Sequence, residues 1–304
     1  MSAEPNRIAT VTPPTPVGTV TAVAPLRDVA GPTALGGGRR RFFDLLWLIS
    51  TTEFRRTYFG TVLGYVWSLL RPLAVFGVLL FVFTNIFRAG ASEVDHYPVM
   101  LLMGIVLFTF FQEATTAGVQ SVVAQEGIVR KTQFPRLVIP LSSVLTAFFN
   151  LLLNLIIVVV FVFAFGIDPQ WTWFLFPVAI AALFVLTAAI AVALSVLFVR
   201  FRDVAIIWVV VSQVLLYGTP ILYPVTAFST EGHHTKEELL MINPLAVIFE
   251  QVRVWVLGEP TAPSAVQAAG GWLHLLPAVA IFLGVCGFAV WIFRREAPRV
   301  AENL

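Results

Sequence analysis

The sequence predicts an all-α, polytopic integral membrane protein that crosses the bilayer about six times. Hydrophobic residues make up 58% of its 304 residues and charged residues only 12%, and the mean hydropathy is +0.88. A composition this apolar indicates a chain that is surrounded by lipid rather than water. Six segments reach the ~20 apolar residues that a helix needs to cross the hydrocarbon core. They cover approximately residues 62–87, 97–123, 137–165, 173–198, 204–222 and 272–293.

The distribution of basic residues predicts the orientation of these spans. All but three of the 19 Lys and Arg residues fall on the side that carries the two termini, and the exceptions are Arg88, Lys236 and Arg253. Loops rich in Lys and Arg remain in the cytoplasm. With an even number of spans, both termini are therefore expected in the cytoplasm.

Two tails are expected to flank the transmembrane domain, which we place at residues 39–295. Residues 1–38 are rich in Pro, Thr, Ala and Gly and lack the continuous apolar stretch of a signal peptide, so they predict a disordered cytoplasmic tail. Residues 296–304 are expected to form a short cytoplasmic C-terminal tail. Cys286 is the single cysteine, which excludes an intrachain disulfide.

An amphipathic helix is predicted at residues 39–58, before the first span. Phe42, Leu45, Leu46 and Ile49 recur at positions i, i+3, i+4 and i+7, and Arg side chains contribute to the polar face. Such a helix lies in the membrane interface, with its cations near anionic headgroups. It either anchors the chain there or guides a substrate toward the spans.

A short segment at residues 125–140 links the second and third spans on the cytoplasmic side. The segment is charged, and Pro135 closes it. Two interpretations are open: an ordinary connecting loop whose cations set the topology, or a protruding turn that docks a cytoplasmic partner.

Two short helices are predicted on the outer face, within residues 224–271. Asn243 and Pro244 have the N-cap and first-turn chemistry of a helix start. The apolar stretch 245–257 that follows is too short to cross the membrane, which favours a re-entrant or interfacial helix. Arg253 follows Glu250 by three residues, so the two side chains are expected to pair.

The sequence lacks the motifs of an enzyme. Neither of its two lysines, Lys131 and Lys236, belongs to a phosphate-binding G-x-x-x-x-G-K-[ST] loop, and no nucleophile elbow, H-E-x-x-H pair or Cys/His cluster occurs. His233, His234 and Glu237 fall on a polar loop, where solvated side chains are the simpler interpretation, so no metal site is expected. Energy for transport against a gradient would have to come from another chain or from an ion gradient.

Glu113 lies alone within the second predicted span. An ionisable group inside a span is costly and usually faces a partner or a polar cavity. Two roles are open, a structural or dimer-interface contact and proton carriage in a self-contained transporter. A lone carboxylate, without His, Asp or Arg partners in other spans, makes a poor proton relay and favours the first role.

Aromatic residues are abundant, with 27 Phe, 8 Trp and 5 Tyr, and a subset clusters near two pairs of spans. Helix packing and lipid contact explain most of them. Stacking on the apolar face of sugar rings is the functional alternative. The clustered subset comprises Tyr58, Tyr65, Trp67, Phe108, Phe110, Phe111, Phe148 and Phe149.

A series of short motifs follows one another along residues 39–295. They are the stretch 60–87, Phe110-Phe111-Gln112-Glu113, Lys131-x-x-Phe134-Pro135, Pro140-Leu141-Ser142, Arg202-Asp203, the stretch 217–224, and Asn243-Pro244 with Arg253. Each is weak alone, but together and in register they resemble the permease subunits of type-2 ABC exporters for polysaccharides. That group exports O-antigens, teichoic acids, capsules and galactan.

The resemblance implies a permease without its own nucleotide site, which forms a homodimer and binds two copies of a cytoplasmic ATPase. The ATPase would hold ATP and Mg²⁺, and this chain would hold no cofactor. The implied function is export of a lipid-linked polysaccharide from the cytoplasmic to the outer face of the bacterial plasma (inner) membrane. The alternatives are an ABC permease for a small molecule or drug, and a stand-alone proton-coupled transporter that uses Glu113.

The resemblance also implies roles for individual residues. The turn that docks the ATPase would comprise Gln125, Glu126, Gly127, Ile128, Val129, Arg130 and Lys131. The substrate conduit would involve Tyr58, Tyr65, Trp67, Phe110, Phe111, Glu113, Phe148, Phe149 and Tyr217. The outer gate would comprise Pro220, Tyr223, Pro224, Asn243, Pro244 and Arg253. Substrate access from the inner leaflet would use Arg40, Arg41, Phe42, Trp47, Arg55, Arg56 and Arg71.

Two positions depart from the pattern of this group. Gly127 stands in the docking turn where members often have Asn, which affects the expected docking geometry. Arg71 replaces a neutral residue, and it either contacts a lipid or pyrophosphate headgroup or extends its charge toward the interface.

Overall fold

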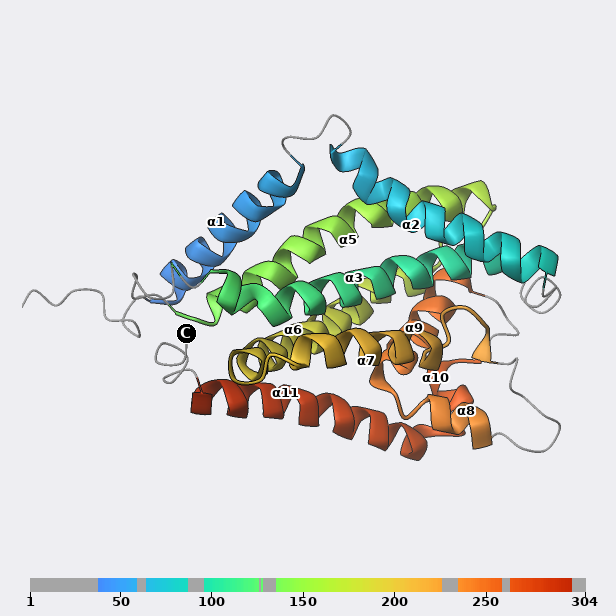
Figure 1. Cartoon of the computed structure of the whole chain (residues 1–304). Helices are drawn as coiled ribbons and strands as arrows, with labels where there is room; N and C mark the ends of the chain where they lie inside the picture. Colours follow the sequence, from blue (N-terminus) through green and yellow to red (C-terminus); the bar gives the residue numbers. More distant parts are fainter. Residues whose placement is uncertain are drawn as a thin grey trace, which may run out of the picture.

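Helix α3 (Tyr97–Ala124) lies in the middle of the structure, and most of its residues are buried. The computed structural model describes residues 38–58, 64–86, 96–125, 127, 135–225, 235–258 and 263–296. Every regular element within these ranges is helical, which confirms the predicted all-α class. α3 packs against both α5 (Val138–Ala164) and α6 (Phe176–Arg200) (Figure 1). An apolar helix with neighbours on several sides is a core helix rather than one with a single buried stripe.

Five helical segments in the described part of the chain are long and apolar enough to cross a membrane. They are Val66–Asn85, Tyr97–Ala124, Val138–Ala164, Trp171–Arg200 and Trp272–Glu296. These segments coincide with five of the six predicted spans. The chain is therefore a multi-pass membrane protein, as its composition predicts.

Three of these spans combine an α-helix with a tighter or wider helical segment. The first joins α2 (Gly64–Phe81) to a π-helical stretch, Val82–Ile86. The fourth begins with the 3₁₀ turn Trp171–Leu175 before α6. The last begins with the 3₁₀ turn Trp272–Leu275 before α11 (Leu276–Glu296).

The remaining predicted span, residues 204–222, is helical only over α7 (Val204–Gly218). Its 15 residues extend about 22 Å at 1.5 Å per residue, less than the ~30 Å hydrocarbon core. The prediction was therefore wrong about the end of this helix. Thr219 is extended, with φ −110° and ψ 138°, because the residue before a proline disfavours the helical conformation. Pro220 also lacks the amide that a further helical hydrogen bond needs.

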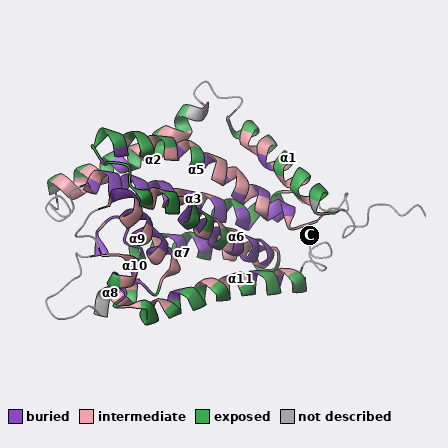
Figure 2. Cartoon of the chain, turned by 180° about the vertical axis from the view of Figure 1, so that it is seen from behind, coloured by how far each residue is buried: buried purple, intermediate pink, exposed green. Residues whose placement is uncertain are grey.

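The peripheral helices α2 and α11 expose much of their apolar surface (Figure 2). In the most apolar stretch of each span, 11% of the residues are buried in the first span and 17% in the last, against 78% in α3. Exposed apolar side chains on spans of this length are accommodated by lipid tails or by another membrane-embedded surface.

The predicted amphipathic helix is present as α1 (Arg39–Tyr58), which lies on α5. The Ser50 hydroxyl donates to the Ser142 carbonyl at 3.2 Å, and the Thr146 hydroxyl donates to the Ser50 carbonyl at 3.3 Å. Next to this crossing point, the ring of Phe149 on α5 makes edge-to-face contacts with the rings of Trp47 and Phe54 on α1. The small side chains let the two backbones approach, and the rings fix the helix in place.

Three short helices gather at the end of the bundle opposite α1 (Figure 1): α8 (Thr235–Leu240), α9 (Pro244–Leu257) and α10 (Ala265–Ala268). The prediction of a helix start at Asn243 is confirmed, since its side chain accepts a hydrogen bond from the Leu245 amide at 3.0 Å. α9 ends at Gly258, whose φ of +61° is the left-handed conformation that favours glycine.

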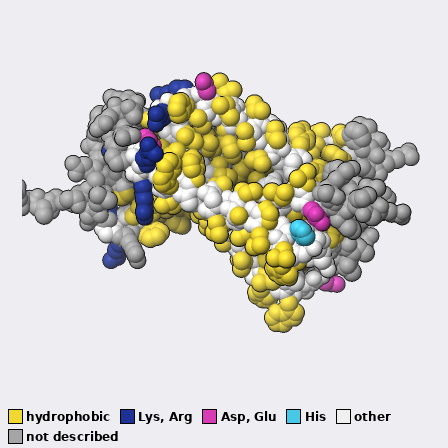
Figure 3. All heavy atoms as spheres, turned by 90° about the horizontal axis from the view of Figure 1, so that it is seen from below, with side chains coloured by type: hydrophobic (Ala, Val, Ile, Leu, Met, Phe, Trp, Pro, Cys, Tyr) yellow, Lys and Arg dark blue, Asp and Glu magenta, His cyan; other side chains and the backbone are white. Residues whose placement is uncertain are grey.

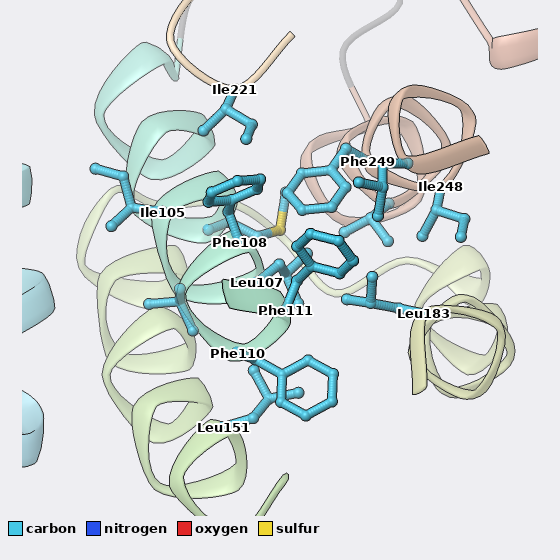
Figure 4. Close-up of a cluster of buried hydrophobic side chains, with 14 of the residues drawn as sticks. Ile105, Leu107, Phe108, Phe110, Phe111, Leu151, Leu183, Ile221, Ile248 and Phe249 are labelled. Atoms are coloured by element: carbon cyan, nitrogen blue, oxygen red, sulfur yellow. The ribbon is translucent and has the colours of Figure 1, made fainter. Parts of the chain in front are cut away.

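The apolar core is continuous where α3, α5, α6 and α9 meet residues 219–225. Figure 4 shows Phe108, Phe110 and Phe111 of α3 in contact range of side chains from these other elements. Gly104 of α3 lies against this segment, because a Cβ there would be 2.9 Å from Cγ2 of Ile221. Around Gly104 the half of the bundle opposite α1 is therefore closely packed, although an apolar cavity of about 130 Å³ lies nearby between α3, α5 and α9.

At Gly118, α3 lies very close to α6, and replacement of this glycine tests the packing. A Cβ at Gly118 would lie 2.7 Å from the Ala191 Cβ and 3.2 Å from its Cα. We expect Gly118→Ala to destabilise the detergent-solubilised protein by about 1–3 kcal/mol, because overpacking forces the helices apart. The midpoint of thermal unfolding measures this change.

Gly77→Ala on α2 is the matched control, since nothing lies within 4 Å of the Cβ that it adds. This variant should unfold at the wild-type temperature or slightly above, because Ala favours a helix more than Gly does. Equal unfolding midpoints for the two variants would contradict the close contact of α3 with α6.

Candidate functional site

A polar pocket of about 660 Å³ opens between α1, α3 and α5. Its lining consists of polar or small side chains from the C-terminal end of α1, the second half of α3 and the first half of α5. The lining residues are Glu53, Arg56, Thr57, Glu113, Ala117, Gln120, Ser121, Ala124, Gln125, Gly127, Ser143, Thr146, Ala147 and Asn150. We call this pocket the polar vestibule.

Helical periodicity explains why these side chains face one space. On α3, Glu113, Ala117, Gln120 and Ala124 are separated by three or four residues and share one face. The polar residues of α5 recur at the same spacing. The two polar stripes face each other beside the end of α1, where they line the vestibule.

Glu113 and Asn150 meet at the deep end of the polar vestibule. The Asn150 side-chain amide donates to Oε1 of Glu113 at 3.4 Å. From Glu113 to the end of α3 at Ala124, the helix rises about 16 Å. Glu113 therefore lies roughly halfway through a ~30 Å hydrocarbon core. Its carboxyl group borders the polar vestibule, as an ionisable group at that depth usually borders a polar cavity.

Charged residues from two other helices accompany Glu113. Glu53 and Arg56 of α1 belong to the vestibule lining. Arg71 of α2 is exposed and close enough to Glu113 to interact with it electrostatically. The hydrogen-bond partner of Glu113 from another span is the neutral Asn150, which sequence spacing alone does not reveal.

The aromatic residues expected at the conduit occupy three kinds of position. Phe110 and Phe111 are only 2% and 0% exposed, and the core of this one chain surrounds them (Figure 4). The half-buried Phe148 ring packs edge-on against Phe184 of α6, and Phe149 contacts α1 as described above. Intrachain packing accounts for all four positions.

Trp67 on α2 and Tyr217 on α7 are exposed, at 58% and 64%, and face away from the packed core. The side chains of Tyr58 and Tyr65 lie outside the part of the structure that is described. Trp67 and Tyr217 are thus the described aromatic residues of the predicted conduit that a substrate or second subunit could reach.

The predicted docking turn is described only at Gln125 and Gly127, and both line the polar vestibule. Gln125 follows the last residue of α3, so the turn leaves the helix at the mouth of the vestibule. The other five predicted residues, Glu126, Ile128, Val129, Arg130 and Lys131, lie outside the described residues.

The residues predicted for substrate access lie along the exposed side of α1 and on α2. Four arginines of α1 are exposed, Trp47 is 60% exposed and Phe42 is half-buried. Arg56 belongs to the vestibule lining and Arg71 lies close to its floor, so these two are nearest to the site. The exposed arginines are Arg40, Arg41, Arg55 and Arg56.

Residues 219–225 and α9 form what we call the distal closure, at the end of the bundle opposite α1. The Tyr97 hydroxyl donates to the Leu222 carbonyl at 2.8 Å, and the Asn243 side-chain amide donates to the Thr219 hydroxyl at 3.1 Å. The Tyr223 hydroxyl donates to the Tyr217 carbonyl at 2.7 Å. Partial burial raises the pKa of Tyr223, which keeps its hydroxyl protonated and able to donate.

The residues predicted for the outer gate come together in this closure. Pro220 and Arg253 line the same small cavity of about 10 Å³ between α3, α9 and residues 219–225. The predicted pairing of Arg253 with Glu250 is confirmed, with Nη1 3.5 Å from Oε1 and both side chains at most 5% exposed. Asn243 and Pro244 start α9, and Pro224 is buried at the end of the segment.

Sequence reasoning missed the α5 side of the polar vestibule. Asn150 and Thr146 stand within an apolar span, where polar residues at helical spacing are an available signal. That signal identifies a polar stripe, but it does not say that the stripe faces Glu113. His233 and His234 lie outside the described residues, and in the described part no cluster of three or more His, Cys, Asp or Glu residues could hold a metal ion.

Arginines mark one end of the molecular surface. Figure 3 shows a wide apolar surface bounded at one end by Lys and Arg side chains. The exposed arginines Arg200, Arg202, Arg294 and Arg295 lie at the ends of α6 and α11. The guanidinium of Arg202 lies over the Phe198 ring and that of Arg295 over the Trp291 ring, which covers aromatic surface close to the charged boundary.

Known proteins resemble this chain in sequence. The profile of the ABC-2 type transporter family matches residues 44–257. The chain is 26% identical to the O-antigen export system permease protein RfbA of Myxococcus xanthus over 256 residues, which cover 84% of this chain and 94% of that protein. It is 32% identical to an O-antigen export system permease protein RfbA of Klebsiella pneumoniae over 182 residues, which cover 60% of this chain and 69% of that protein.

The buried Glu250–Arg253 pair of the distal closure is open to test by a double-mutant cycle. Arg253→Met leaves the Glu250 carboxylate buried without this cation, and we expect a loss of about 3–5 kcal/mol in unfolding free energy. Glu250→Gln should cause a similar loss in unfolding free energy, because the Arg253 guanidinium then stays buried without the Glu250 carboxylate. The double variant should lose clearly less than the sum of the two, because the charges are then removed together. Additive losses in thermal or denaturant unfolding would show that the pair is not coupled.

Proposed function

Because this chain belongs to the ABC-2 type transporter family, we propose that it is the permease subunit of an ATP-driven exporter. The proposed substrate is a lipid-linked polysaccharide, of the O-antigen, teichoic acid or galactan type, which moves from the cytoplasmic to the outer face. The relatives named as O-antigen export permeases support this substrate class.

The observation that carries the proposal is the asymmetry of the bundle along the membrane normal. A polar vestibule penetrates from the end that carries α1, whereas the interior of the other end is apolar in the described residues and is covered by the distal closure. A polar cavity inside the hydrocarbon region marks a path for a hydrophilic substrate. The exposed arginines around the α1 end support the proposal that this end faces the cytoplasm, with both termini inside the bacterial plasma membrane.

The energy source in this proposal is a separate chain. Two copies of a cytoplasmic ATPase would bind ATP and Mg²⁺, and each would dock on residues 125–131 of one permease in a homodimer. The position of Gln125 and Gly127 at the vestibule mouth supports this arrangement, because a push on the turn would act directly on the end of α3. In the same proposal, α1 guides the lipid-linked substrate, and the exposed Trp67 and Tyr217 line the conduit.

Affinity purification in mild detergent tests the partner first. Tagged permease from native membranes should retain a nucleotide-binding ATPase at about one-to-one stoichiometry, identified by mass spectrometry. Deletion of the permease should leave the lipid-linked glycan inside the cell, and the wild-type gene should restore export. An intact permease that is repeatedly isolated alone, and that transports without any ATPase in a manner sensitive to an uncoupler, would overturn the exporter proposal.

Cysteine labelling tests the water access and orientation of the polar vestibule. In a Cys286→Ser background, Gln120→Cys should react with a membrane-impermeant maleimide in inverted vesicles but not in intact cells, because Gln120 is exposed and lines the vestibule. Leu183→Cys in the core and Leu283→Cys on the apolar face of α11 are controls that should remain unlabelled from both sides. Labelling of Gln120→Cys only from outside the cell would reverse the proposed orientation.

A further inference from the structure

We infer that the polar vestibule binds hydroxyl groups of the sugar unit nearest the lipid in the exported substrate. This inference rests on the proposed function and adds to it the part of the substrate that the pocket accepts. The volume of about 660 Å³ falls within the roughly 300–1,000 Å³ of small-ligand pockets, which is room for a sugar unit but not for a polymer.

The lining has the hydrogen-bonding chemistry that hydroxyl groups need. Carboxylates accept hydrogen bonds, and side-chain amides both donate and accept, so a sugar hydroxyl finds a partner in either role. Carboxylates, amides and hydroxyls together account for most of the described lining. These side chains are Glu53, Glu113, Gln120, Gln125, Asn150, Thr57, Ser121, Ser143 and Thr146.

The charge of the lining favours a neutral sugar over a phosphate group. Among the described lining residues, two carboxylates accompany one cation, Arg56. A phosphate at the floor would approach the Glu113 carboxylate, and like charges repel strongly where water is scarce. Arg71 does not belong to this lining.

Two side chains at the vestibule have hydrogen-bonding capacity to spare. Oε1 of Gln125 is buried and accepts no hydrogen bond from the described residues. Within the described part of the structure, Glu113 accepts one hydrogen bond, from Asn150, although a carboxylate has about four acceptor positions. Buried polar atoms in native proteins usually have partners, so donors are expected at these positions, and sugar hydroxyls are donors.

The lining also suits a ligand that must leave again. Its described residues include no aromatic ring on which a sugar could stack. Binding then depends on hydrogen bonds alone, and several of the hydroxyls already donate within their own helices, as Ser121 does to the Gly118 carbonyl at 2.7 Å. A transport path requires binding that is favourable enough for access and weak enough for release.

The experiment uses the complete exporter, permease with ATPase, in lipid nanodiscs. Two probes are compared: a polyprenyl diphosphate that carries one N-acetylhexosamine, and the same polyprenyl diphosphate without sugar. The readout is the probe concentration that gives half-maximal stimulation of ATP hydrolysis. In Glu113→Ala and in Gln120→Ala, we expect this concentration to rise about tenfold or more for the sugar-bearing probe, in line with the loss of hydrogen bonds to a buried polar site. It should change less than about twofold for the diphosphate without sugar.

Glu113→Gln keeps an acceptor oxygen and should fall between Glu113→Ala and the wild type. Gln112→Ala is the matched control, because Gln112 neighbours Glu113 on α3 but does not line the vestibule. Co-purification of the ATPase with each variant verifies assembly.

The outcomes separate this inference from the proposed function. An unchanged response of Glu113→Ala and Gln120→Ala to the sugar-bearing probe would overturn the inference, and so would an equal loss with both probes, which would indicate a phosphate site. A wild-type exporter that assembles, hydrolyses ATP and ignores both probes would instead overturn the proposed substrate class.

Discussion

Within the hydrocarbon core of a membrane, a polar group finds hydrogen-bond partners only in the protein itself or in a cavity that the protein creates. This constraint explains the arrangement of the polar groups on α3, the most buried helix of the chain. Thr115 donates back to the Phe111 carbonyl at 2.7 Å and in turn accepts from the Trp208 indole at 3.0 Å. Glu113, two residues earlier, points to the other side, where Asn150 and the polar vestibule receive it. Thr115 thus requires a hydrogen-bonding side chain on one side of α3, and Glu113 requires a polar group or cavity on the other side.

The same constraint divides α3 into two functional halves. Its first half carries Phe108, Phe110 and Phe111 and is enclosed by α5, α6, α9 and the segment after α7 (Figure 4). Its second half carries Gln120 and Ser121 on the face toward α1 and α5. One continuous helix therefore closes the bundle at one end and opens it at the other. A movement applied to the end of α3 at Gln125 would reach both halves, because a helix transmits displacement along its axis.

The sequence predicts the helices of this fold well because the lipid requirement leaves a strong pattern. Long apolar runs identify five spans, Asn243 identifies a helix start, and the spacing of Glu250 and Arg253 identifies an ion pair, all from residues close in the sequence. Contacts between distant residues were not predictable in this way. The partnership of Glu113 with Asn150 depends on which helices pack together, and the burial of Phe110 and Phe111 depends on how α3 is rotated. Periodicity gives the face of a helix but not the neighbour that covers it.

The end of α7 shows how a local rule and a tertiary requirement combine. Pro220 stops the helix about 8 Å short of a full crossing, and the chain continues in extended form. Extended backbone cannot satisfy its own polar groups in hydrocarbon, so other elements must do so. Tyr97 supplies a donor to the Leu222 carbonyl, and Asn243 binds the Thr219 hydroxyl. These bonds hold the segment against α3 and α9, where the Glu250–Arg253 pair stabilises the supporting helix. In the proposed export of a polysaccharide through this end, the same bonds would have to separate, and the groups that they release would need new partners. The hydroxyl-rich substrate itself can provide them as it passes, so the closure is compatible with a polar polymer and much less so with an apolar molecule of similar width.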